Sequence, residues 1–177
     1  MLIKKILILF AVIGSLIING CNNDNPKSKS EYNMYNENII KANKYLLKED
    51  IEKIESYIKR RNWEMQNTGT GLWYMVYEHG KGDLARPGQI VSMKFRVELL
   101  DGTVCYSSDS VGLKHFRIGQ GGVESGLEEG ILLLRTGDKA RFIMPPHIAY
   151  GLIGDQYKIP PHSIILYELE VVKISGN

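Results

Sequence analysis

The sequence predicts an α+β fold in which an antiparallel β-sheet wraps over one short helix. Apolar and polar residues alternate over 91–99 and over 139–144, which is typical of strands with one buried face and one solvated face. Between these strands, residues 125–134 place Leu127 and Ile131 on one face of a helix. A longer amphipathic helix is expected before the sheet.

The chain begins with the anatomy of a signal peptide over residues 1–20. Two lysines are followed by the apolar run 6–18, which is shorter than the roughly 20 residues that span a bilayer. The pair Gly20-Cys21 resembles a bacterial lipobox, which implies cleavage before Cys21 and attachment of lipid to that residue. Ordinary secretion with an incidental cysteine is the alternative.

Charge and cysteine content narrow the function classes. Cleavage would remove two lysines and no acidic residue, so 22 − 2 = 20 basic residues would balance 20 acidic ones. Phosphate binding needs a basic excess, so nucleic acid is not an expected partner. With Cys21 acylated, Cys105 would have no disulfide partner. No metal site or cofactor is predicted, because the four histidines lack ligand spacing: His79, His115, His147 and His162.

Two segments are expected between the cysteine and the sheet. Residues 21–35 are largely polar and carry a proline, which predicts a flexible tether. Residues 36–66 are predicted to contain an amphipathic helix, most clearly over 36–63. Its apolar positions are Ile40, Leu47, Ile51, Ile54 and Ile58. The helix either packs on its own domain or associates with another copy or a partner, and the short apolar stripe favours packing on its own domain.

The remaining residues, 68–177, are predicted to form one β-rich domain after the helix-breaking segment 68–71. Asp101-Gly102 predicts a hairpin turn. Ser125 suits a helix N-cap, with Glu128 at the capping-box spacing. Strands are expected at 72–78, 91–99, 103–106, 115–118, 139–144 and 163–174.

Four motifs follow one another within residues 119–167: SGLEEG, TGDKARF, AYG and IPPHS. In combination they resemble the second half of an FKBP-type peptidyl-prolyl cis-trans isomerase domain. The strings YSS, VESGLEEG and AYGLIGD are most similar to the gliding-motility-associated FKBP-like lipoproteins. The resemblance implies an FKBP-like sheet over one helix, and isomerisation of proline-containing polypeptides in an apolar pocket without metal or cofactor.

The same resemblance implies a set of site residues. Phe95 and Tyr150 are the expected catalytic residues, with the Tyr150 hydroxyl available to a substrate carbonyl. Glu124 would contribute its backbone N–H. The expected substrate-binding positions are Val123, Glu124, Leu127, Ile159, Tyr167, Cys105 and Tyr106. Considered singly, Phe95, Leu127 and Tyr167 would be ordinary core residues.

Four positions depart from the family pattern. Glu124 stands at a common isoleucine position and Leu127 at the tryptophan position, and the other two are Cys105 and Tyr106. Cys105 stands where a phenylalanine walls the pocket, and Tyr106 stands where an aspartate polarises the twisting amide. They favour an alternative function, a weakly catalytic binding module or chaperone that docks a partner of a motility or secretion machine. The main expectation is an isomerase that assists the folding of exported proteins. It would be anchored through lipidated Cys21 and would face the periplasm of a Gram-negative bacterium.

Overall fold

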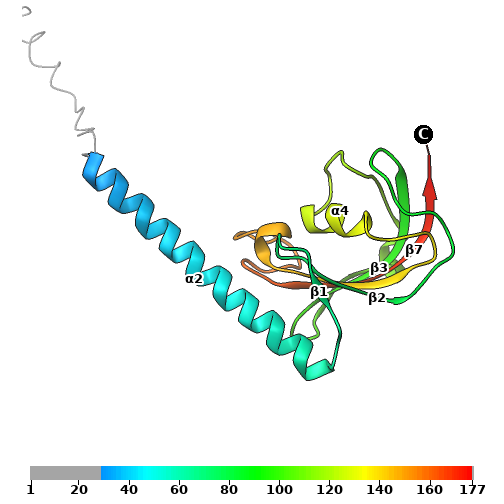
Figure 1. Ribbon diagram of the computed structural model, residues 1–177, viewed down its shortest axis with the longest axis horizontal. Helices are drawn as coiled ribbons and strands as arrows, with labels where there is room; N and C mark the ends of the chain where they lie inside the picture. Colours follow the sequence, from blue (N-terminus) through cyan, green and yellow to red (C-terminus); the bar gives the residue numbers. More distant parts are fainter. Residues whose placement is uncertain (1–28, 177) are drawn as a thin grey trace, which may run out of the picture. The chain divides into compact units, whose positions relative to one another are not determined.

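The computed structural model describes residues 29–176, so the expected signal peptide and Cys21 lie outside the described residues. Helix α2, Lys29–Arg61, comes first (Figure 1). It begins seven residues before the predicted start at 36, so the expected tether over 21–35 is helical from Lys29 onward. After Pro26 the sequence offers no helix breaker, and the polar run therefore continues into the helix.

Helix α2 ends at Arg61, short of the predicted end at 66, because Asn62 adopts a left-handed backbone with φ 52°. The Asn62 N–H donates to the Lys59 carbonyl at 3.2 Å, and the Trp63 N–H donates to the Ile58 carbonyl at 3.3 Å. This pair of bonds is the Schellman arrangement, which satisfies the last carbonyls of a helix. Among residues 29–176, no helix combines the length and apolar character needed to cross a membrane.

One seven-stranded antiparallel sheet forms the body of residues 43–176. The strand order is β1-β2-β6-β7-β3-β4, and β5 pairs with β3. The turn between β3 and β4 has Gly102 at φ 93°, as expected for the Asp101-Gly102 hairpin. The strands are β1 Gln66–Asn67, β2 Trp73–Glu78, β3 Ile90–Leu99, β4 Val104–Ser107, β5 Lys114–Arg117, β6 Lys139–Met144 and β7 Ile165–Ser175.

Helix α4, Ser125–Ile131, lies over the inner face of this sheet (Figure 1). Leu127 and Ile131 are fully buried there. The helix approaches β6 closely, since a Cβ at Gly130 would come within 2.4 Å of the Phe142 ring. Gly130, the second glycine of the SGLEEG motif, thus allows the helix and the strand to meet. The predicted α+β fold class is confirmed. Two short helices were not predicted, α3 Ser108–Val111 and the 3₁₀ helix η2 Pro146–Ile148.

The predicted capping box at the start of α4 is wrong. The N-cap is Glu124, and no side chain caps the helix. The Ser125 hydroxyl donates instead to the Ile148 carbonyl at 3.4 Å, and Glu128 accepts the Gly121 N–H at 2.9 Å. Glu124 is buried, and the helix begins at Ser125.

The second half of α2 packs on the other face of the sheet. Ile54, Tyr57 and Ile58 form a buried cluster with residues of the sheet and of the loop before β7, Ile143, Ile164 and Leu166. Packing on its own domain is therefore confirmed for this part of the helix. The predicted stripe is buried only toward its C-terminal end, since Leu47 is 41% exposed and Ile51 is half-buried. The chain divides into compact units after Ala42, and Ile40 in the first unit is exposed.

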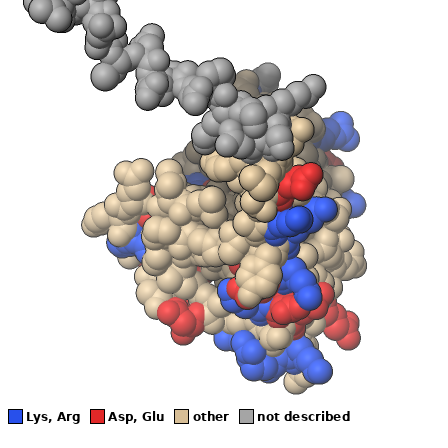
Figure 2. Space-filling model, turned by 90° about the vertical axis from the view of Figure 1, so that its left-hand side faces the viewer, with Lys and Arg blue, Asp and Glu red and all other residues tan. Residues whose placement is uncertain are grey.

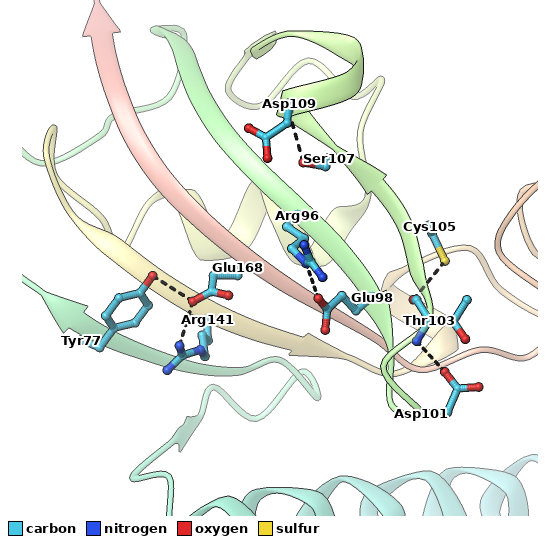
Figure 3. A network of polar contacts seen from close by, with 10 residues as sticks. All are labelled: Tyr77, Arg96, Glu98, Asp101, Thr103, Cys105, Ser107, Asp109, Arg141 and Glu168. Atoms are coloured by element: carbon cyan, nitrogen blue, oxygen red, sulfur yellow. Dashed lines mark hydrogen bonds and ion pairs between the residues drawn. The ribbon is translucent and has the colours of Figure 1, made fainter.

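Polar contacts cover the part of the outer face shown in Figure 3. Arg141 contacts Glu168 at 2.7 Å, and the Tyr77 hydroxyl donates to the same carboxylate at 3.1 Å. Arg96 pairs with Glu98 along β3. Figure 2 shows acidic and basic side chains close to one another on the face it displays. Charges of opposite sign are thus mixed on this surface.

Candidate active site

The predicted site residues meet between the inner face of the sheet, α4 and the loop 145–163. Phe95, Cys105, Leu127, Ile159 and Tyr167 belong to one buried cluster. Tyr106, Val123 and Tyr150 are half-buried and pack against it. The Phe95 and Tyr167 rings are 6.1 Å apart between centroids. The fold therefore brings together predicted residues from five parts of the chain: β3, β4, the segment 123–127, the loop 145–163 and β7.

A buried carboxylate lies at the centre of this site. The Glu124 side chain is 3% exposed. Its Oε1 accepts hydrogen bonds from the hydroxyls of Tyr150 at 2.5 Å and Tyr167 at 2.7 Å. Its Oε2 accepts from Lys114 Nζ at 3.2 Å, and Lys114 also donates to the Tyr167 hydroxyl at 2.9 Å. We call Lys114, Glu124, Tyr150 and Tyr167 the polar cluster.

The polar cluster keeps Glu124 ionised. Burial opposes the charge of this carboxylate, but Lys114 and the two tyrosine hydrogen bonds outweigh burial and lower the pKa of Glu124. Burial, the adjacent negative charge and the hydrogen bonds to it raise the pKa of both Tyr150 and Tyr167. At neutral pH the Glu124 carboxyl is therefore ionised and both phenols are protonated.

This arrangement corrects the expectation that the Tyr150 hydroxyl is available to a substrate carbonyl. A phenol carries one proton, and the proton of Tyr150 is donated to Glu124. The sequence pattern could not show this, because Glu124 was expected to contribute only its backbone N–H. In the structure its side chain organises the hydroxyl groups of the site.

Cys105 and Tyr106 lie on β4 at the side of the site next to the loop 145–163. Cys105 is buried, its thiol donates to the Lys158 carbonyl at 3.5 Å, and burial raises its pKa. It is therefore a protonated packing residue at neutral pH. The Tyr106 hydroxyl donates to Asp155, and this hydrogen bond, with burial, raises the pKa of Tyr106 to about 12. Asp155 also accepts the Ile159 N–H at 2.7 Å within the loop. The bond from Tyr106 to Asp155 therefore links β4 to the loop.

A cavity of about 310 Å³ opens beside the polar cluster. It is lined by Lys114, Gly122, Val123, Glu124, Ala149 and Tyr150. Its volume is at the lower end of the roughly 300–1,000 Å³ typical of small-ligand pockets. Three of its lining residues were predicted as site residues, Val123, Glu124 and Tyr150.

Lys114 was not predicted as a site residue, although the sequence contains a signal for it. In strand β5 the buried residue is Phe116, and side chains two residues apart point to the same face. Lys114 is therefore directed inward, opposite the fully buried Met93 on β3. Extending the predicted strand 115–118 by one residue at its N-terminal end would have identified a lysine on the inner face.

Among the described residues 29–176, no group of three or more His, Cys, Asp or Glu side chains could hold a metal ion. Three of the histidines contact other partners. His115 Nδ1 lies 2.8 Å from the Ser92 hydroxyl, and His147 Nε2 lies 2.9 Å from the Thr70 carbonyl. His162 Nε2 lies 3.2 Å from Asp50 Oδ1.

Comparison with known proteins gives the family. The model of the FKBP-type peptidyl-prolyl cis-trans isomerase family matches residues 82–172. The chain belongs to this family. The matched range begins before β3 and ends within β7, so it includes every FKBP site residue discussed above.

Individual FKBP relatives agree with this assignment. FK506-binding protein 1A of Emericella nidulans is 40% identical over 91 residues, which cover 51% of this chain and 84% of that protein. The probable isomerase FkpA of Neisseria meningitidis is 31% identical over 140 residues, 77% of this chain and 51% of that protein. The crystal structure of AtFKBP13 matches with a TM-score of 0.61 and 32% identity, covering 63% of this chain and 99% of that one.

This chain spans only part of the length of several relatives. The chain spans 51%, 65% and 46% of the length of the proteins from Neisseria meningitidis, Yarrowia lipolytica and Haemophilus influenzae. The match to the Neisseria protein extends over more of the chain than the family model does.

Proposed function

We propose that this chain catalyses cis-trans isomerisation of peptide bonds that precede proline. The observation that carries the proposal is the FKBP domain with a cavity of about 310 Å³, which Tyr150 lines and which lies next to the buried cluster of Phe95 and Tyr167. Isomerisation of Xaa-Pro bonds takes tens to hundreds of seconds without a catalyst, which is slow enough to limit protein folding. No nucleophile or metal is needed, because rotation breaks only the amide resonance.

The physical basis of catalysis is a difference in binding between two states of the substrate. The planar amide has more charge separation than the twisted amide, so a site that excludes water disfavours the planar ground state. Each tenfold acceleration requires about 1.4 kcal/mol of preferential binding of the twisted state. The buried rings of Phe95 and Tyr167 and the half-buried Tyr150 provide such surroundings.

The test is the refolding of a protein whose slow phase is limited by proline isomerisation. Micromolar amounts of the full chain should accelerate that phase. Short Leu-Pro and Phe-Pro peptides, whose isomers are followed by NMR, give an independent measurement of the same activity. An unchanged slow phase together with unchanged peptide exchange would contradict the proposal.

We further propose that the protein works at a membrane surface facing the periplasm of a Gram-negative bacterium and assists the folding of exported proteins. The signal-peptide pattern of residues 1–20 and the Gly20-Cys21 pair support this proposal. Cys21→Ser should release the protein from the membrane fraction, whereas Cys105→Ser, the matched control, should leave it there. Unchanged fractionation of the Cys21 variant would refute the anchor. The likeness to gliding-motility lipoproteins stays a prediction.

A second function is a binding module or chaperone that docks a partner. The observation that favours it is the apolar surface of the loop after Tyr150, where Leu152 is 64% exposed, Ile153 66% and Tyr157 82%. A chaperone would suppress aggregation of an unfolded protein that contains no proline, whereas an isomerase would not. Suppression that is lost when Leu152 and Ile153 are changed to serine, without loss of peptide isomerisation, would assign the loop to this second function.

A further inference from the structure

The chemistry of the twisted peptide bond requires a particular hydrogen-bond donor, and this inference rests on the proposed isomerase function. In the planar amide, the nitrogen lone pair is delocalised into the carbonyl and accepts no hydrogen bond. In the twisted amide the lone pair is localised on nitrogen and becomes an acceptor. A donor directed at that nitrogen therefore binds the twisted state and not the ground state, which is the requirement for raising kcat.

Three of the four polar-cluster side chains are unsuited to this role. Glu124 is an ionised carboxylate and can only accept hydrogen bonds. Tyr150 and Tyr167 each have one hydroxyl proton, and both donate it to Glu124 Oε1. A substrate amide would have to displace a charge-assisted hydrogen bond to obtain either proton.

Lys114 differs from these three residues because an ammonium group has three N–H donors. Two of them have acceptors, Glu124 Oε2 at 3.2 Å and the Tyr167 hydroxyl at 2.9 Å. Among the described residues, no acceptor takes the third donor. Lys114 also lines the cavity, and its side chain is 23% exposed, so a substrate can approach it.

The surroundings of Lys114 hold its ammonium group over two aromatic rings. Nζ lies 5.6 Å from the centroid of Phe95 and 5.4 Å from the centroid of Tyr167, both within cation–π range. Glu124 restrains the ammonium group from one side and remains charged in doing so. The long lysine side chain is therefore fixed at the cavity and not free to sample solvent.

We propose that Lys114 is a catalytic residue that donates a hydrogen bond to the prolyl nitrogen of the twisted peptide bond. Glu124 acts as a positioning residue for Lys114 and for the two tyrosines. No covalent bond forms and no proton is transferred, because the ammonium group keeps its proton when the planar amide is restored. Val123, Ala149 and Tyr150, which line the cavity, bind the apolar part of the substrate in both states, and Lys114 distinguishes between the states.

The first variant is Lys114→Met, which keeps an unbranched side chain and removes the donor. We expect kcat for a Leu-Pro peptide to fall at least tenfold while KM changes little, because the lost bond exists only in the twisted state. Lys94→Met is the matched control. Lys94 lies on the outer face of β3, paired with Glu170 at 3.2 Å, so its removal should leave kcat unchanged.

A second variant covers the case in which Lys114→Met fails to fold with Glu124 left buried and unpaired. The double change Lys114→Met, Glu124→Leu removes both charges, and apolar replacement of a buried ion pair is commonly tolerated. The folded double variant should show the same loss of kcat. Retained turnover in either folded variant would overturn the proposal.

Chemical rescue separates a catalytic lysine from a merely structural one. Lys114→Ala leaves space at the cavity, and added ethylammonium should restore part of the lost kcat, whereas tetramethylammonium, which has no N–H donor, should not. A loss of kcat that ethylammonium fails to restore would overturn the donor role. Absence of turnover in the wild-type chain would instead refute the proposed isomerase function, so the two failures are distinguishable.

Discussion

Replacing Glu124 by glutamine tests whether the buried carboxylate holds the site together. Glutamine has nearly the same shape, but it removes the charge and turns one acceptor into a donor. Lys114 then loses its ionic partner, and its N–H groups face an NH₂ group or a neutral carbonyl. In the wild-type chain Glu124 Oε1 accepts from the hydroxyls of Tyr150 at 2.5 Å and Tyr167 at 2.7 Å. In the variant these two hydroxyls must share the weaker amide oxygen.

The expected loss of stability follows from these contacts. Breaking a buried ion pair by removing one partner costs about 3–5 kcal/mol. The cost here should be smaller, because Lys114 is 23% exposed and glutamine keeps one acceptor. We therefore expect the free energy of unfolding to fall by about 2–3 kcal/mol, within the range for hydrogen bonds to charged groups. With a urea m-value of about 2 kcal/mol/M, the midpoint should fall by about 1–1.5 M.

The measurement is urea unfolding followed by the fluorescence of the two tryptophans, with Glu64→Gln as control. Glu64 is exposed, so its replacement should change the free energy of unfolding by less than about 0.5 kcal/mol.

The pKa of Glu124 is lowered on folding, so the stabilisation that the ionised carboxylate gives is present above its usual pKa of 4.5 and is lost as the pH falls through the folded value. The difference between wild type and Glu124→Gln should therefore shrink below pH 4.5. Equal stability at pH 7 would refute the account of the polar cluster.

Two further predictions concern the packing on the two faces of the sheet. Ile54→Ala should lower the free energy of unfolding by about 2–5 kcal/mol, because the Ile54 side chain is fully buried between α2 and the sheet. The control Ile40→Ala, at an exposed position, should have little effect. Equal effects of the two variants in urea unfolding would count against this packing. Gly130→Ala should lower the free energy of unfolding by about 1–3 kcal/mol or more, because the new Cβ would lie 2.4 Å from the Phe142 ring. The control is Gly176→Ala, where the new Cβ would meet open space. A thermal midpoint for the Gly130 variant equal to that of the control would show that α4 does not approach β6 so closely.

The sheet could be predicted where burial repeats with period two. The strand 139–144 was predicted with its observed bounds, because inward and outward residues alternate and Gly137 precedes it. The two-residue strand β1, Gln66–Asn67, was missed, since both residues are exposed and its pairing depends on β2. The early start of α2 at Lys29 was missed because a polar segment without an apolar stripe resembles a tether.

The proximity of the predicted site residues could be expected from the motifs, but their hydrogen bonds could not. Phe95, Tyr150 and Tyr167 lie in or against one cluster, and their roles in a site stay a prediction. The direction of the Glu124 side chain depends on Lys114, ten residues earlier in the chain, and on a tyrosine of the last strand. Such long-range pairing leaves no local pattern. The same holds for Asp155, whose bond to Tyr106 joins β4 to a distant loop.

NMR exchange spectroscopy of a Leu-Pro peptide with catalytic amounts of the full chain tests the isomerase activity and the role of Lys114 together. Uncatalysed exchange takes tens to hundreds of seconds and gives no cross-peaks between cis and trans signals on the timescale of the experiment. We expect cross-peaks with the wild-type chain. With Lys114→Met we expect an exchange rate at least tenfold lower. Exchange no faster than in buffer would contradict the isomerase function, and equal exchange with both chains would contradict the role of Lys114.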